Sequence, residues 1–144
     1  MVGVVEVRDL LVTPCVITSI EGVIPAGFPS PAADYETGRL DLTKILVPHP
    51  SATFTVRISG HSMTRAGIHD GDLALVDRSL DAEHDNVVIV SIDGELTCKR
   101  LLIRKGRTII APDSDDHSFR MIDVTGREDV EIWGVVTNTI RFHR

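Results

Sequence analysis

Hydrophobic and polar residues alternate along much of the chain beyond residue 53. Phe54, Val56 and Ile58 alternate with polar residues, which is the pattern of a strand with one buried face. Further runs rich in β-branched residues predict strands at 73–77, 87–92, 96–103, 108–111 and 132–140. Turn sequences such as Asp93-Gly94 separate them. The pattern predicts a mostly β domain of antiparallel strands.

The part of the chain before these strands has a different character. Val- and Ile-rich runs at 2–7 and 15–20 predict strands in an N-terminal arm. The stretch 25–31 contains three prolines, so it is expected to be extended, exposed and irregular. We interpret it as a hinge between the arm and the main body. Residues 41–46 predict a short helix with Asp41 as its N-cap.

The composition is that of an ordinary globular domain. The chain has 144 residues, of which 42% are hydrophobic and 25% charged. Its net charge of −6 argues against a bare nucleic-acid-binding surface. No apolar run is long enough to span a membrane, and a secretory signal pattern is absent from the first residues. Two cysteines without a Cys-x-x-Cys pair predict a reducing, cytoplasmic location.

The sequence offers little support for a metal ion or a nucleotide. The six histidines are scattered, without a His-Glu-x-x-His pattern, so surface positions are expected. Asp113, Asp115 and Asp116 lack the glycine and the distal glutamate of a calcium loop and predict a solvated turn. No glycine-rich phosphate loop occurs. We therefore expect no metal and no cofactor.

Two segments are candidates for chemistry. Residues 59–63, Ser-Gly-His-Ser-Met, follow a predicted strand, and a serine there can expose its hydroxyl in a tight turn. A plain turn between two strands fits the same spacing. On the strand at 96–103, Lys99 shares one face with Leu101, and Cys98 lies on the other face as an expected small core residue. A lysine that snorkels from a partly apolar surface is the alternative interpretation of Lys99.

Several further motifs accompany these two segments. They are 26–35 (AGFPSPAADY), 49–53 (HPSAT), 59–63 (SGHSM), 67–73 (GIHDGDL), 76–77 (VD), 94–100 (GELTCKR) and 134–136 (GVV). Together they resemble the LexA-like family of self-cleaving serine peptidases, and within it the UmuD-type branch of SOS mutagenesis proteins. The resemblance covers about residues 26 to 142. It implies a LexA/UmuD-type peptidase domain of twisted antiparallel sheets.

The resemblance also implies roles for individual residues. Ser62 is expected to be the nucleophile, Lys99 the general base, and Ala26–Gly27 the bond that is cut. The backbone N–H groups of His61 and Ser62 are the expected oxyanion donors. Burial lowers the pKa of a lysine from its usual value near ~10.4, so a lysine base needs a dry, partly apolar pocket.

Cleavage of that bond would divide the chain into two parts. Residues 1–26 would form an N-terminal arm, and residues 27–144 a β-rich Ser-Lys peptidase and dimerisation domain. Since the bond and the dyad belong to the same polypeptide, each chain would be cut about once, without turnover.

The cellular role that the resemblance implies is a subunit of an error-prone, translesion DNA polymerase in the SOS response to DNA damage. RecA filaments on single-stranded DNA would stimulate self-cleavage, and the shortened homodimer would join a Y-family polymerase. Only 26 residues precede Gly27, too few for the helix-turn-helix domain of the family's repressors, so sequence-specific DNA binding is not expected. The alternatives are a non-cleaving regulatory binding module and a remnant of a LexA-like repressor.

Overall fold

A computed structural model describes residues 2–6, 13–32 and 35–144, with side chains from residue 13 onward. Strands predominate in these residues, which confirms the predicted mostly β fold. The strands are β1 Val2–Glu6, β2 Val16–Glu21, β3 Glu36–Asp41, β4 Thr53–Ile58, β5 Leu73–Asp77, β6 Val87–Ile92, β7 Glu95–Arg104, β8 Arg107–Ala111, β9 Ile122–Asp123 and β10 Val130–Ile140. The helical elements are α1 Leu42–Leu46 and the 3₁₀ turns η2 Pro50–Ala52 and η3 Thr64–Ala66. Within the described part of the chain, no helix is long and apolar enough to cross a membrane.

The chain forms two compact units. The larger contains Met1–Asp9 and His49–Arg144, and the smaller contains Leu10–Pro48. The predicted arm, 1–26, therefore contributes a strand to each unit. The proline-rich stretch 25–31 is exposed and irregular, as expected, but it connects β2 to β3 within the smaller unit rather than linking the two units.

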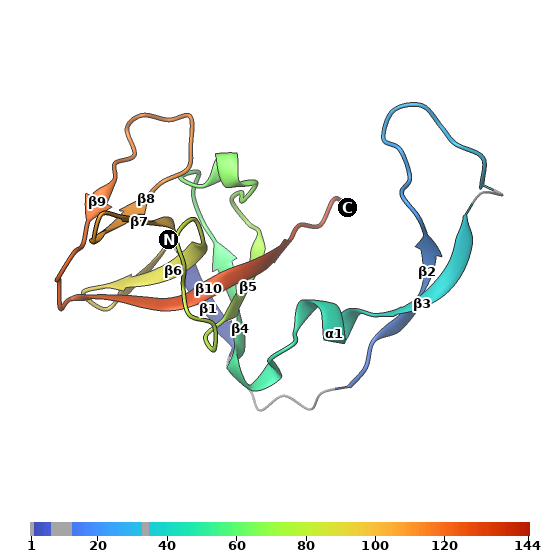
Figure 1. The fold of residues 1–144 in the computed structure, drawn as a ribbon, viewed down its shortest axis with the longest axis horizontal. Helices are drawn as coiled ribbons and strands as arrows, with labels where there is room; N and C mark the ends of the chain where they lie inside the picture. Colours follow the sequence, from blue (N-terminus) through green and yellow to red (C-terminus); the bar gives the residue numbers. More distant parts are fainter. Residues whose placement is uncertain (1, 7–12, 33–34) are drawn as a thin grey trace. The chain divides into compact units, whose positions relative to one another are not determined.

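The larger unit is built on an eight-stranded antiparallel sheet with the strand order β1-β4-β5-β10-β6-β7-β8-β9 (Figure 1). Strand β1 forms one edge, and its Val2 lies opposite Ile58 near the end of β4. It also lies close to β7, because the sheet curls. The turn after β4, which carries Ser62, and strand β7, which carries Lys99, meet in this unit.

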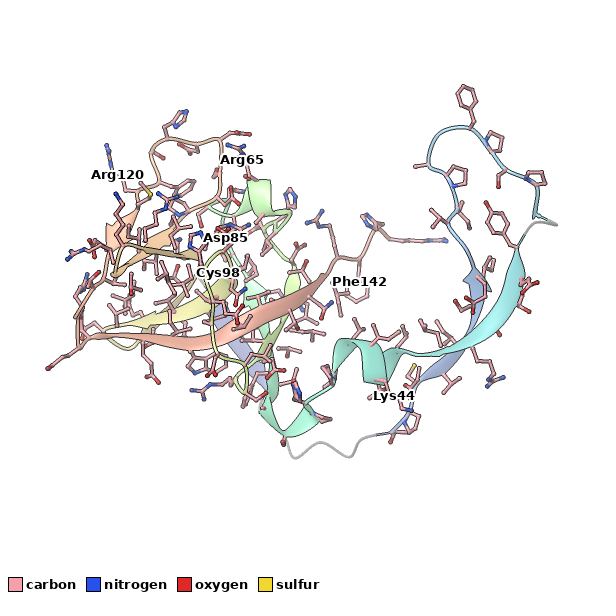
Figure 2. All side chains as sticks on the ribbon, in the orientation of Figure 1. Lys44, Arg65, Asp85, Cys98, Arg120 and Phe142 are labelled. Atoms are coloured by element: carbon pink, nitrogen blue, oxygen red, sulfur yellow. The ribbon has the colours of Figure 1, made fainter. Side chains whose placement is uncertain are left out.

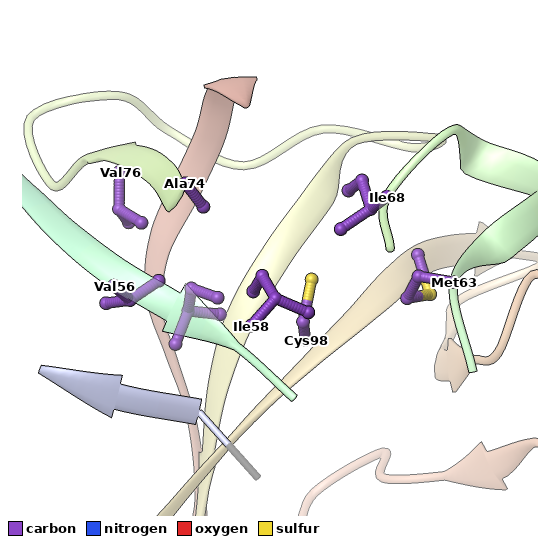
Figure 3. Close-up of a cluster of buried hydrophobic side chains, with 8 residues drawn as sticks. Val56, Ile58, Met63, Ile68, Ala74, Val76 and Cys98 are labelled. Atoms are coloured by element: carbon purple, nitrogen blue, oxygen red, sulfur yellow. The ribbon is translucent and has the colours of Figure 1, made fainter. Parts of the chain in front are cut away.

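Both faces of the sheet are covered by buried side chains around β6. On β6, Ile89 belongs to one apolar cluster while Val88 and Val90 belong to another, as the alternation of side chains along a strand requires. The first cluster, drawn in Figure 3, contains Val56, Ile58, Met63, Ile68, Ala74, Val76, Ile89 and Cys98. The second contains Val88, Val90, Leu101, Ile110, Val124 and Val135.

Strand β10 crosses the middle of this sheet and depends on a glycine. Its register shifts between Ile132 and Gly134, where it pairs with β6. A Cβ atom on Gly134 would lie only 2.5 Å from Val76 Cγ1 on the neighbouring β5. The glycine therefore lets two central strands approach, which gives a packing reason for the Gly-Val-Val motif at 134–136.

The smaller unit consists of the β2–β3 ribbon and α1. Asp41 caps the helix as predicted, because its Oδ1 accepts hydrogen bonds from Thr43 N at 3.0 Å and from Cys15 N at 3.1 Å. The second bond ties the start of β2 to the helix. None of the described residues of this unit is buried.

Candidate active site

The turn that carries Ser62 follows β4 and is anchored on residues 70–72. Gly60 has a φ of +97°, a conformation that glycine adopts without strain, and its N–H donates to Asp70 Oδ1 at 2.8 Å. The N–H of Ile58 donates to the carbonyl of Asp72, and its own carbonyl accepts from Gly71 N. These hydrogen bonds therefore fix the C-terminal end of β4, just before the turn that carries Ser62.

Asp72 is the centre of this anchor. Its side chain is 1% exposed, and Arg141 donates to both carboxylate oxygens, each at 2.8 Å. His69 N donates to Asp72 Oδ2 as well, at 2.9 Å. The Arg141 guanidinium holds the pKa of the Asp72 carboxyl below its usual value in spite of burial. The Gly-Asp motif at 71–72 thus has a structural role beside the site.

Ser62 and Lys99, which are 37 residues apart in sequence, meet through their side chains. Lys99 Nζ donates to Ser62 Oγ at 3.1 Å. The residue after Ser62, Met63, and the residue before Lys99, Cys98, are buried in the same apolar cluster (Figure 3). Packing of these two neighbours therefore fixes the backbone on both sides of the pair.

The environment of Lys99 favours its neutral form. Lys99 lies opposite the fully buried Val88 in the β6–β7 pairing, so it shares a strand face with an apolar neighbour. Burial lowers the pKa of the Lys99 ammonium below its ordinary value. A larger fraction of Lys99 is thus neutral near pH 7 than of an exposed lysine, and a neutral amine can accept a proton from a hydroxyl.

Cys98 has the opposite character. It is 4% exposed, and burial raises the pKa of its thiol to about 11. The thiol is therefore protonated at neutral pH and is a poor nucleophile. The prediction that Cys98 is a small core residue is confirmed.

The expected oxyanion donors lie in the turn itself. In the part of the chain that the structure describes, neither His61 N nor Ser62 N has a protein acceptor, whereas the preceding Gly60 N is bonded to Asp70. Two free N–H groups beside a serine hydroxyl can stabilise a developing oxyanion. The His61 side chain is exposed, and among the described residues it has no hydrogen bond to Ser62 or Lys99.

Ala26 and Gly27 are in the smaller unit, in the loop between β2 and β3, and both are exposed. The loop is closed by Tyr35, whose hydroxyl donates to the Val23 carbonyl at 3.2 Å and bonds to the Ser30 hydroxyl. The expected scissile bond lies between these two attachment points. The other expected site residues, Ser62, Lys99 and His61, belong to the larger unit.

Two further residues, Asp113 and Arg100, lie beside the Ser62–Lys99 pair, and the sequence did not predict this placement. A solvated turn is correct for Asp115 and Asp116 but wrong for Asp113, whose side chain is only 28% exposed and accepts hydrogen bonds from Arg100. The backbone of Asp113 bonds to the Ser62 turn. No spacing rule links these positions. Elsewhere in the described chain, no three His, Cys, Asp or Glu side chains gather into a possible metal site.

Comparison with known proteins agrees with this geometry. The Peptidase S24-like family matches residues 18–137. Protein MucA of Salmonella typhimurium is 49% identical over 120 residues, which cover 83% of this chain and 81% of MucA. Protein ImpA of Shigella flexneri is 48% identical over 115 residues, 80% of this chain and 77% of ImpA. The LexA repressor of Xylella fastidiosa is 36% identical over 123 residues, 85% of this chain and 57% of that repressor.

The match covers most of the chain and includes both segments that meet at the Ser62–Lys99 contact. The alignments with MucA and ImpA, at almost half identity, cover most of this chain and most of each relative. The chain therefore belongs to the Peptidase S24-like family, and within it to the UmuD-type branch of SOS mutagenesis proteins.

Proposed function

We propose that Ser62 and Lys99 form a dyad that cuts the peptide bond between Ala26 and Gly27 of this chain. The observation that carries the proposal is the 3.1 Å contact between Lys99 Nζ and Ser62 Oγ, made by a lysine whose pKa is lowered by burial. Cleavage there leaves residues 27–144 as the processed product. Each molecule undergoes the reaction once, because the bond is part of the same polypeptide as the dyad.

The reaction proceeds in two stages. Neutral Lys99 takes the proton of the Ser62 hydroxyl while Oγ attacks the Ala26 carbonyl carbon, and the N–H groups of His61 and Ser62 bind the oxyanion. The C–N bond then breaks, and Lys99 returns the proton to the leaving amine of Gly27. Water, deprotonated by Lys99, hydrolyses the ester between Ala26 and Ser62. Lys99 returns that proton to Ser62 Oγ as the ester bond breaks, so the products are a carboxylate at Ala26, a free amine at Gly27 and the restored dyad.

We further propose that the cut takes place in the cytoplasm and that the shortened chain acts as a homodimer. A RecA filament on single-stranded DNA stimulates the cut, and the product joins a Y-family polymerase for translesion synthesis. Membership of the UmuD-type branch supports this assignment. A non-cleaving module is not favoured, because both members of a bonded Ser-Lys pair are present. A remnant of a LexA-like repressor is also not favoured, since MucA matches more closely than the LexA repressor does.

Alanine substitution of each dyad member tests the proposal. Ser62→Ala removes the nucleophile and Lys99→Ala the base, so each is expected to reduce self-cleavage below detection. Intact mass before and after incubation with activated RecA filaments measures the cut. Ser51→Ala and Lys44→Ala, at exposed positions, are the matched controls and are expected to cleave normally. Cleavage of either dyad variant at the wild-type rate rejects the dyad.

A further inference from the structure

We infer that Arg100 and Asp113 are positioning residues that hold Ser62 at hydrogen-bonding distance from Lys99. The inference rests on the proposed function of the dyad. Its basis is a closed ring of contacts: Lys99 Nζ to Ser62 Oγ, the Ser62 carbonyl to Asp113, the Asp113 carboxylate to Arg100, and the peptide bond from Arg100 back to Lys99. The ring fixes the nucleophile relative to the strand that carries the base.

The backbone of Asp113 binds the Ser62 turn at two points. Asp113 N donates to the Ser62 carbonyl at 2.8 Å, and the Asp113 carbonyl accepts from Arg65 N at 2.8 Å. In Figure 2, Arg65 lies on the short helical turn beside the loop that follows β8. One residue of that loop is thus bonded to both Ser62 and Arg65.

The side chain of Asp113 is fixed in turn by Arg100. Arg100 Nε and Nη2 both donate to Asp113 Oδ2, at 3.2 and 2.9 Å, and the two side chains are 27% and 28% exposed. Arg100 Nη1 donates to the Asp85 carbonyl at 2.5 Å, and Asp85 N donates to Leu101 O, so the guanidinium is held on both sides. A planar fork with several donors makes this arrangement specific to arginine.

The ring adds a constraint that core packing does not supply. The buried side chain of Met63 fixes the turn to the core. The orientation of the Ser62 carbonyl is set instead by its hydrogen bond from Asp113 N. A displacement of about 1 Å between reacting groups can lower a rate about 100-fold. Loss of the Arg100 fork would free Asp113, and with it the Ser62 carbonyl.

Charge and geometry make different predictions for Arg100. Arg100 is on the opposite face of β7 from Lys99, and its charge faces the Asp113 carboxylate. If its charge acted directly on Lys99, Arg100→Lys would preserve the effect, and removal of the charge would move the pH midpoint of the reaction. If geometry matters, Arg100→Lys loses the fork and lowers the rate without moving the midpoint.

The test compares Arg100→Lys with Arg107→Lys in the full chain. Arg107 forms the same fork on Asp123 Oδ2, at 2.9 and 2.7 Å, between β8 and β9, so it is a matched control. Self-cleavage without RecA is measured across alkaline pH. Arg100→Lys is expected to lower the plateau rate about 10- to 100-fold with an unchanged midpoint, whereas Arg107→Lys keeps the wild-type rate. Asp113→Ala, which removes the acceptor of the fork and keeps the backbone of this residue, is expected to behave like Arg100→Lys.

A second readout does not depend on cleavage. In a Ser62→Ala background, amide hydrogen exchange at Asp113 and Arg65 is expected to quicken in Arg100→Lys and not in Arg107→Lys. Unchanged exchange in both Arg100→Lys and Asp113→Ala, an unchanged plateau rate, or a shifted midpoint overturns the inference. If exchange quickens as expected but the wild-type chain is never cut, the proposed function is wrong. The inference that Arg100 and Asp113 position Ser62 then still holds.

Discussion

The larger and the smaller unit differ most in what they bury. Every buried apolar side chain among the described residues lies in the larger unit, and none lies in the smaller one. The buried carboxylates of the larger unit are also paired: Asp72 with Arg141, and Asp77 with Ser79 and with His49 Nδ1 at 2.6 Å. In the smaller unit Val23 and Phe28 are 87% and 92% exposed.

This difference matches the different demands that the proposed self-cleavage makes on the two units. The dyad needs a fixed separation and a dry lysine, and both require close packing. The segment that we propose is cut must instead adopt the extended shape that a peptidase site accepts. A two-stranded ribbon is only marginally stable by itself, so its loop can change shape while the larger unit stays folded. The proposed function therefore assigns the chemistry to the larger unit and the bond to be cut to the smaller unit.

The largest effect that tests this division is complete loss of cleavage from a change in the smaller unit. Ala26→Trp places a bulky side chain next to the bond, which must come within about 3–3.5 Å of the serine oxygen. Because Ala26 is exposed, the variant is expected to fold normally and to remain uncut. N-terminal sequencing of the wild-type product is expected to begin at Gly27.

Ala32→Trp, at another exposed position of the same loop, is the control and is expected to be cut. A processed Ala26→Trp chain, or a product that starts at another residue, would place the bond elsewhere.

The division also explains which strands could be predicted. Strands β5 and β6 have the predicted limits, because each alternates or is continuously apolar against a buried core. Strand β3 was missed: it reads Glu-Thr-Gly-Arg-Leu-Asp and has no buried residue. Strand β9 has two exposed residues. The periodicity of hydrophobic residues reflects which side chains are buried. A strand that buries few side chains therefore has no such periodicity in its sequence.

The candidate site shows the same limit. Ser62 and Lys99 were predicted from a family resemblance, and the structure brings them together. Composition and spacing alone left Ser62 in a plain turn and Lys99 as a snorkelling residue. Asp113 and Arg100 could not be predicted, because their contact depends on the β7–β8 pairing and on the path of the next loop. No local sequence pattern predicts a contact of this kind.

The next effect in size concerns stability. Ile89→Ala removes a fully buried side chain at the centre of the larger unit and is expected to lower its free energy of unfolding by about 2–5 kcal/mol. Ile20→Ala makes the same change at a side chain of the smaller unit that is 54% exposed, and an effect within about 0.5 kcal/mol is expected. Urea unfolding followed by far-UV circular dichroism measures both, since the strands of both units contribute to that signal. Equal effects would contradict the contrast between the units.

The smallest effect is a rise in the cleavage rate of about tenfold per pH unit. It shows whether the titrating group lies in the larger or in the smaller unit of the chain. Only neutral Lys99 can accept the Ser62 proton, so the rate without RecA should rise about tenfold per pH unit below the pKa of Lys99 and level off above it. Burial lowers that pKa, which means that the plateau should begin below the value near ~10.4 of an exposed lysine. A gel time course at several pH values gives the curve, with Lys99→Ala as the control for contaminating protease and far-UV spectra to exclude unfolding.

Substitutions in the two units should affect this curve differently. Ala32→Trp changes only the smaller unit. It can therefore alter the plateau rate but should leave the pH midpoint of the curve unchanged. Val88→Ser, opposite Lys99 in the β6–β7 pairing, introduces a polar group beside the lysine and should move the midpoint toward higher pH. A curve that is flat from neutral to alkaline pH rejects Lys99 as the limiting base, and a rise centred near ~6.5 points to a histidine instead. A midpoint that moves with Ala32→Trp and not with Val88→Ser would place the titrating group in the smaller unit and reverse the division of roles.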